Sequence, residues 1–126
     1  MLLRLNFAAE LPIYRQIRDQ FILGIAGGQL RAGEKLPAIR ALANETGVNM
    51  MTINKAYQLL KSEGYITADR RGGTVVAERG DSSGGGNLPA ELRLHAASAK
   101  LSGIGRDDWL CLCGRAYDEL SSKESE

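Results

Sequence analysis

The stretch Leu36–Thr74 limits the possible folds of this chain more than any other, because two helix-forming segments flank a Gly-Val turn and a hairpin follows them. Residues 38–45 carry apolar side chains three and four positions apart, the spacing of a helix with one buried side. Gly47 can adopt the positive φ of a tight turn at the end of a helix, and Val48 can fill the angle between the two helices. The pattern therefore predicts two helices that cross closely.

The segment after this turn, residues 50–63, has the pattern of a longer amphipathic helix. Asn49 is a favourable N-cap because its side-chain oxygen can accept a backbone N–H of the first turn, and Gly64 is a typical C-terminal stop. The residues that recur at i, i+3, i+4 and i+7 and should face the core are Ile53, Ala56, Tyr57 and Leu60. The opposite side carries Met51, Asn54, Lys55, Gln58 and Ser62. Such groups suit the reading of base edges in a DNA major groove, although the polar side of an ordinary amphipathic helix would simply be solvated.

A hairpin completes the stretch. Residues 65–68 and 74–77 are rich in β-branched or aromatic side chains, and Asp69–Gly73 between them is a turn sequence. Arg70 and Arg71 at its tip can contact phosphates or enter a minor groove, whereas alone they would more often be a solvated turn. A helix, a turn, a polar-faced helix and a basic hairpin together predict a winged helix-turn-helix that binds double-stranded DNA.

These residues resemble the signature of the GntR family of bacterial transcription regulators. The signature reads Leu-Pro-Ser-x-Arg-x-Leu-Ala, then Gly-Val, Thr-Val/Ile, Ala-Tyr, Leu, Glu-Gly and Gly-Thr, and this chain matches it in order at Leu36-Pro37, Arg40, Leu42-Ala43, Gly47-Val48, Thr52-Ile53, Ala56-Tyr57, Leu60, Glu63-Gly64 and Gly73-Thr74. The resemblance implies that the DNA contacts are Arg40, Asn49, Thr52, Asn54, Lys55, Arg71 and Gly72. Met51 and Arg70 join this set through their places on the polar helix side and at the hairpin tip.

Two positions depart from the signature. Ala38 replaces the usual serine and removes the N-cap of the first helix, at a cost of about 1 kcal/mol in helix stability. Met50 stands where many members carry arginine at the start of the recognition helix, so a base preference cannot be transferred from relatives. A methionine there either contacts a thymine methyl group or has no part in readout, and the sequence leaves both open.

The residues before this stretch predict a short strand and a helix. Residues 1–7 alternate apolar and polar side chains, the period of a strand. Pro12 then begins an amphipathic helix whose apolar side chains repeat every four residues and which Gly27-Gly28 ends. A short strand followed by Leu11–Ile17 resembles the YtrA-like subfamily of the same family.

The C-terminal third differs in composition. Residues 80–87 contain four glycines and no apolar side chain, which is typical of a flexible linker between a DNA-binding domain, residues 1–79, and a region of residues 88–126. Residues 88–101 form one predicted helix, and Asp107 and Asp108 suit the start of another.

Two helices with such wide apolar surfaces cannot build a core alone, so they fold onto the winged helix or pair with a second chain. We expect a homodimer, as the subfamily resemblance also implies, with an interface formed by Leu92, Ala96, Ala99, Trp109, Leu112, Cys113, Ala116, Tyr117 and Leu120. The predicted fold class is therefore α+β, mainly α, with a winged helix-turn-helix and a two-helix dimerisation unit.

The charge distribution agrees with DNA binding. Residues 1–80 hold eleven lysines and arginines against seven acidic residues, a net charge of +4, and residues 81–126 hold five against eight, a net charge of −3.

We predict a sequence-specific, homodimeric transcription regulator, a repressor at a pseudo-palindromic operator. The alternative is a winged helix that binds an acidic protein without specific DNA readout. A small-molecule effector remains open.

Other functional classes find little support. His95, Cys111 and Cys113 are too few for a structural zinc site, so we predict no metal and no cofactor. The chain offers no convincing catalytic set or phosphate-cradling loop, and we predict no enzyme activity. No signal peptide or membrane-spanning apolar run is present, and we expect a cytoplasmic protein that does not contact the membrane.

Overall fold

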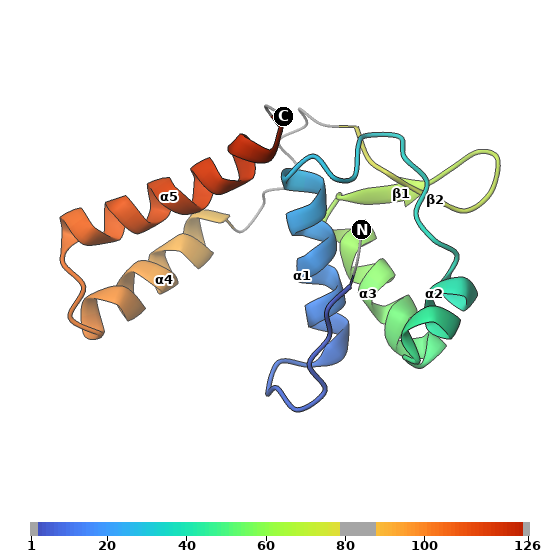
Figure 1. Ribbon diagram of the computed structural model, residues 1–126, viewed down its shortest axis with the longest axis horizontal. Helices are drawn as coiled ribbons and strands as arrows, with labels where there is room; N and C mark the ends of the chain where they lie inside the picture. Colours follow the sequence, from blue (N-terminus) through green and yellow to red (C-terminus); the bar gives the residue numbers. More distant parts are fainter. Residues whose placement is uncertain (1–2, 79–87, 125–126) are drawn as a thin grey trace. The chain divides into compact units, whose positions relative to one another are not determined.

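The computed structural model describes residues 3–78 and 88–124, with side chains up to residue 120, and its contacts divide the chain into two units, residues 1–84 and 85–126. The first unit holds α1 (Ile13–Ala26), α2 (Ile39–Thr46), α3 (Met50–Ser62), β1 (Ile66–Ala68) and β2 (Thr74–Val76), and the second holds α4 (Leu88–Leu101) and α5 (Arg106–Glu124) (Figure 1). The predicted fold class, a mainly helical α+β chain with a winged helix-turn-helix, is confirmed. The predicted linker lies outside the described residues.

The first unit is built around one hydrophobic core. The apolar side chains that repeat every four residues on α1 pack against the inner face of α3, and Phe21 meets Tyr57 edge to face with ring centroids 5.7 Å apart. Each fully buried aliphatic or aromatic side chain contributes roughly 1.5–3 kcal/mol. The buried apolar residues are Ile17, Phe21, Ile25, Leu30, Leu36, Leu42, Val48, Ile53, Ala56, Tyr57, Leu60, Ile66 and Val76. The four residues predicted as the inner face of α3 are all among them.

The turn between α2 and α3 has the predicted geometry. Gly47 adopts a φ of +75°, and its N–H donates to the Ala43 carbonyl, which ends α2. Val48 is buried in the core beside it. The Asn49 side chain accepts a hydrogen bond from the Met51 N–H at 2.7 Å and so caps α3, as predicted. The Gly47 turn and the Asn49 cap therefore determine where α3 begins.

The hairpin, called the wing below, is an antiparallel pair in which Ile66 lies opposite Val76 and Ala68 opposite Thr74. The segment before α2 adds to it, because the Leu36 N–H donates to the Thr74 carbonyl at 2.8 Å and the Val76 N–H donates to the Glu34 carbonyl at 2.9 Å. This segment connects α1 to α2. Its backbone ties the wing to the start of the helix-turn-helix.

The prediction of a strand in residues 1–7 is wrong for the part that the structure describes, because residues 3–7 form no strand. Side chains of α1 replace a neighbouring strand as hydrogen-bond partners. The Gln16 side chain accepts from the Asn6 N–H at 2.8 Å and donates to the Asn6 and Leu11 carbonyls, and the Gln20 side chain bonds the backbone of Arg4 in the same way. The alternating pattern reflects packing of Leu3 and Leu5 against the core.

The second unit is a pair of helices with little interior. Helix α4 has the predicted bounds, and α5 begins at Arg106 with Asp107 and Asp108 in its first turn, as expected. Ala99 is the one apolar side chain in the described part of this unit that is buried. Cys111 and Cys113 are both free. Along the described ranges, no helix is both long and apolar enough to span a membrane.

Candidate nucleic-acid interface

The outer face of α3 carries solvent-exposed side chains that could read a base sequence. Met51, Asn54, Lys55 and Gln58 follow one another at i, i+3, i+4 and i+7, and all four are exposed. Thr52 is half-buried at the edge of this face. Since the opposite face of α3 is entirely buried, the helix cannot rotate to present other side chains. The structure therefore presents the predicted α3 residues to solvent on a fixed helix.

Lys55 is held rather than freely mobile. Its Nζ lies 4.2 Å from the centroid of the Tyr14 ring on α1, within the range of a cation–π contact. Such a contact at a partly exposed site is worth about 0.5–1 kcal/mol. Sequence periodicity could not reveal this pair, because its members are 41 positions apart. Tyr14 thus limits the directions in which the Lys55 ammonium group can point.

An ion pair fixes the C-terminal end of α3 to α1. The Arg18 guanidinium donates from Nε to Glu63 Oε1 at 2.8 Å and from Nη2 to Oε2 at 2.7 Å, and it also contacts Asp19. These hydrogen bonds raise the pKa of Arg18 above its ordinary value despite the opposing effect of burial. A two-pronged arginine–carboxylate contact restricts rotation as well as separation. Together with Tyr14 and Lys55, it connects α1 to α3 through two pairs of polar side chains outside the core.

Tyr57 links α3 to the segment before α2. Its hydroxyl donates a hydrogen bond to the Pro37 carbonyl at 2.8 Å, and its ring is buried in the core. Burial disfavours the phenolate and raises the pKa of Tyr57 to about 12. The side chain therefore stays neutral and hydrogen-bonded at physiological pH, which keeps α2 and α3 in a fixed relation.

Arg40 lies on the first turn of α2 and is exposed. The structure shows no side-chain cap at Ala38, in agreement with the loss of the usual serine. Helix α2 instead begins with the Leu42 N–H donating to the Ala38 carbonyl at 2.9 Å. The guanidinium of Arg40 is thus available beside the N-terminal end of the helix-turn-helix.

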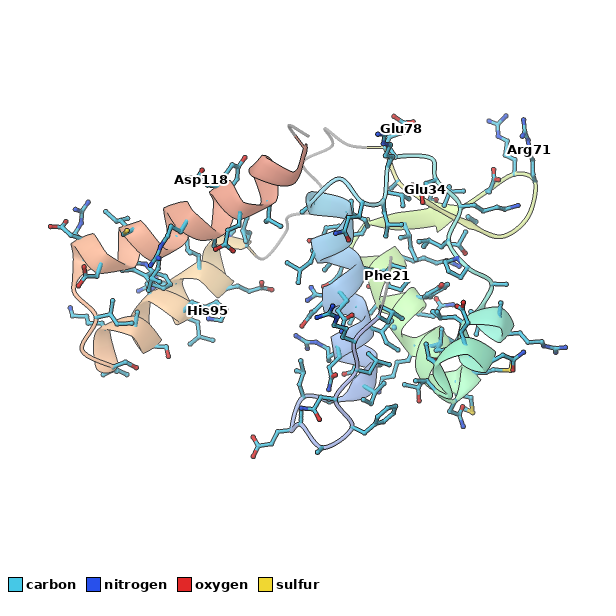
Figure 2. All side chains as sticks on the ribbon, in the orientation of Figure 1. Phe21, Glu34, Arg71, Glu78, His95 and Asp118 are labelled. Carbon is cyan, nitrogen blue, oxygen red and sulfur yellow. The ribbon has the colours of Figure 1, made fainter. Side chains whose placement is uncertain are left out.

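The wing ends in a basic loop. Arg70 and Arg71 are both exposed, and Figure 2 shows the Arg71 side chain directed outward from the loop between β1 and β2. Gly72 has a φ of +96° and Gly73 one of +83°, a conformation that other residues rarely adopt. An added Cβ at Gly73 would also approach Lys35 Cε to 3.2 Å. The two glycines therefore allow the tight turn that presents the arginines.

All nine predicted DNA-binding residues lie in the first unit, on three successive elements. Arg40 belongs to α2, Asn49 is the N-cap of α3, and the wing loop supplies the last three residues of the set. The side-chain oxygen of Asn49 is already engaged as a cap, so its amide N–H groups are what it could offer to DNA. The sequence did not predict the two contacts that join α3 to α1, Lys55 with Tyr14 and Glu63 with Arg18.

The residues predicted for dimerisation lie on α4 and α5. Leu92 is 52% exposed and Leu112 41% exposed, while Ala96, Trp109, Cys113 and Leu120 are half-buried. Tyr117 and Ala116 are exposed, and Ala99 is buried within the helical pair. The described helices thus leave part of the predicted set uncovered.

A cavity of about 360 Å³ lies in the first unit near the segment before α2. Apolar residues form most of its wall, and Glu34, Lys35 and Glu45 lie around it; the apolar lining is Leu3, Phe21, Leu30, Leu36, Pro37 and Leu42. The Glu34 carboxylate accepts a hydrogen bond from the Arg31 N–H at 3.1 Å. Within the described ranges, no buried side-chain nitrogen or oxygen lacks a hydrogen-bond partner, so no polar group marks this cavity as a ligand site.

Comparison with known sequences agrees with the signature. The family model for bacterial regulatory proteins of the gntR family matches residues 11–76. An uncharacterised HTH-type transcriptional regulator of Bacillus subtilis, YhcF, is 36% identical over 76 residues, which cover 60% of this chain and 63% of that protein. The HTH-type transcriptional repressor YtrA of Bacillus subtilis is 35% identical over 77 residues, which cover 61% and 59%. The chain thus spans about three fifths of the length of these two relatives.

Solved structures show the same fold. YtrA from Sulfolobus acidocaldarius, a GntR-family transcription factor, is 39% identical, with a TM-score of 0.65 over 78% of this chain and 99% of that one. A transcriptional antiterminator from Listeria monocytogenes is 26% identical, with a TM-score of 0.84 over 95% and 92%. The DNA-binding domain of AraR in complex with operator ORX1 is 32% identical, with a TM-score of 0.52 over 61% and 95%. The similarity to the YtrA-like subfamily is thereby confirmed.

Proposed function

The chain belongs to the gntR family of bacterial regulatory proteins, and from that premise we propose that it is a homodimeric repressor that binds a pseudo-palindromic operator in a sequence-specific manner. Members of this family are transcription regulators rather than enzymes. The observation that carries the proposal is the rigidly held outer face of α3, where Met51, Asn54, Lys55 and Gln58 are all exposed. Helices of this kind read base edges from the major groove.

Exposed arginines on the elements before and after α3 in the chain support contact with the DNA backbone. Arg40 precedes α3 in the chain, and Arg70 and Arg71 follow it on the wing. All three are exposed, and phosphate contacts of this kind set the register of a protein on DNA. The AraR domain, which is 32% identical over 61% of this chain, was solved in complex with its operator. In the proposed complex, α3 enters the major groove, and the arginines contact the flanking backbone or an adjacent minor groove.

The homodimer rests on the exposed apolar side chains of the second unit. Leu92, Leu94 and Leu101 are 52%, 72% and 89% exposed on α4, and Leu110 and Leu112 are 49% and 41% exposed on α5. Soluble proteins rarely leave such a concentration of leucines in water without a partner. A second copy of the same pair of helices supplies a matching apolar surface through two-fold symmetry. Two recognition helices would then meet half-sites spaced by about one turn of DNA.

Repression is proposed from a single relative. The Bacillus subtilis protein YtrA, 35% identical over 77 residues, is a transcriptional repressor. A dimer seated on an operator near a promoter can block polymerase by occupancy alone. The proposal therefore needs no additional activating surface and no small-molecule effector.

The test is selection of duplexes from a random library, followed by affinity measurements with the selected duplex. Arg40→Ala and Lys55→Ala should each weaken binding roughly five- to one-hundred-fold. Both variants should stay folded, because both side chains are exposed and Lys55→Ala removes only the contact with Tyr14, worth about 0.5–1 kcal/mol. Lys100→Ala, which removes a lysine from α4, is the matched control and should keep wild-type affinity. Wild-type affinity in both interface variants would contradict the assigned contacts.

Salt dependence separates this proposal from the alternative, a winged helix that binds an acidic protein. Release of counterions from phosphates makes DNA affinity fall steeply as salt rises. We expect steep salt dependence together with preference for the selected duplex. Failure to select any sequence, with weak binding that changes little with salt, would favour the protein-binding alternative.

A further inference from the structure

The first turn of α3 presents two large apolar side chains to solvent. Met51 is 80% exposed and Met50 is 45% exposed, and neither takes part in the hydrophobic core of the unit. Exposed apolar side chains on an otherwise polar helix face often mark a binding surface. These two lie at the end of α3 that the Asn49 cap fixes. Their exposure therefore favours contact with an apolar group of a binding partner.

Met51 lies at the N-terminal end of the outer face of α3. It precedes Asn54, Lys55 and Gln58 by three, four and seven positions, so the four side chains share one side of the helix. The hydrogen bond from the Met51 N–H to Asn49 Oδ1 orders the backbone at this residue. Recognition helices place their N-terminal residues against base edges, so Met51 would face bases rather than phosphates.

The chemistry of the thioether limits which groups on the base edges the Met51 side chain can recognise. Methionine has no N–H or O–H to donate, and its sulfur is only a weak acceptor, so it cannot replace the paired hydrogen bonds by which arginine reads guanine or asparagine reads adenine. Lys55, the cation on the next turn of the same face, lies against Tyr14. The apolar group that base edges present in the major groove is the 5-methyl group of thymine.

We propose that Met51 reads the 5-methyl group of a thymine in each operator half-site, with Met50 widening the apolar contact. This inference rests on the proposed function, because it assigns a base preference to the same helix face. Burial of one methyl group against a methionine side chain corresponds to about a fourfold gain in affinity. The operator should therefore contain a thymine opposite the first turn of α3, and its methyl group should matter.

The test uses the duplex selected by the wild-type protein, remade with each thymidine replaced singly by deoxyuridine. This change removes only the methyl group and keeps the hydrogen-bonding edge of the base. We expect one or two positions in each half-site where the replacement weakens binding about fourfold. Met51→Ala should lose this discrimination at those positions, whereas Met51→Leu, which keeps an apolar side chain, should retain it. Because Met51 is exposed, both variants should fold.

The outcomes separate this inference from the function on which it rests. Equal affinity for thymidine and deoxyuridine at every position, in a protein that still selects a sequence, would overturn the methyl readout alone. Discrimination that persists unchanged in Met51→Ala would assign the methyl contact to another residue and also overturn the inference. Failure to select any sequence would overturn the proposed function together with it.

Discussion

The two units of this chain use their apolar residues in opposite ways. The described part of the first unit buries thirteen hydrophobic side chains in one core, whereas that of the second unit buries Ala99 and leaves several leucines exposed. A unit with such a core can hold a DNA-reading helix in place without help from a partner. A pair of helices with almost no interior gains its stability from the surface that covers it. The comparison teaches that the same kind of residue supports folding in one unit and, in the proposed dimer, association in the other.

The largest expected effect is on the core of the first unit. Leu60 is fully buried on the inner face of α3, and Leu60→Ala should lower the free energy of unfolding by about 2–5 kcal/mol through lost burial and a residual cavity. Leu23 on α1 is 56% exposed, and Leu23→Ala should change the free energy of unfolding by less than about 0.5 kcal/mol. Urea unfolding followed by circular dichroism measures both. Similar losses in the two variants would contradict the contrast between core and surface.

The second prediction concerns association rather than folding. Leu112→Asp should separate the dimer into monomers and weaken operator binding roughly one-hundred-fold, because the two recognition helices would no longer bind as one unit. The melting temperature of the first unit should not change. Cys111→Asp places the same charge one position earlier, outside the predicted dimer set, and should keep the dimer. Sedimentation velocity measures the masses, and an intact dimer in Leu112→Asp would contradict the proposed interface.

The third prediction uses the buried phenol of the first unit. Burial raises the pKa of Tyr57 to about 12, from an unfolded value near 10, so the folded state holds the proton more tightly. The corresponding stability is complete below pH 10 and is lost as the pH rises from 10 to 12, by about 2–3 kcal/mol. Tyr57→Phe should remove this part of the pH dependence, and it should lose about 1 kcal/mol at neutral pH with the hydrogen bond to Pro37. Parallel pH profiles of the unfolding free energy in the two proteins would disprove the assignment.

The smallest expected effect lies on the contact that holds Lys55. Tyr14→Ala should release the Lys55 side chain and weaken operator binding by roughly two- to fivefold, the equivalent of about 0.5–1 kcal/mol. Tyr14→Phe keeps an aromatic face and should bind nearly as well as the wild type. Fluorescence anisotropy with a labelled duplex resolves such differences. A larger loss in the phenylalanine variant would point to a direct role of the hydroxyl group instead.

The local features of the first unit could be predicted from the sequence because neighbouring residues determine them. Gly47 at a φ of +75°, the Asn49 cap and the buried face of α3 all follow from residues within one or two turns of the chain. The wing was predicted for the same reason, since its turn residues separate two β-prone segments. In each case the local preference and the tertiary packing agree.

The misses arose where distant residues decide the outcome. Alternation in residues 1–7 predicted a strand, but a strand needs a neighbour, and in the described part the side chains of Gln16 and Gln20 take that role. The contact of Arg18 with Glu63 joins residues 45 positions apart, which no periodic pattern can show. The Arg18–Glu63 contact joins the end of α3 to α1. Sequence patterns thus predicted the exposed face of α3 but not the contacts that hold the helix in place.

The measurement that tests the central claim most directly is binding to the DNA upstream of the gene that encodes this protein, beside a scrambled duplex of equal length, with the mass of the complex determined. We expect two chains per duplex, clear preference for the upstream DNA, and an affinity that falls by at least about one-hundred-fold between roughly 50 and 200 mM salt. Equal, salt-insensitive binding of both duplexes, or a complex with a single chain, would contradict the account of a dimeric operator-binding regulator.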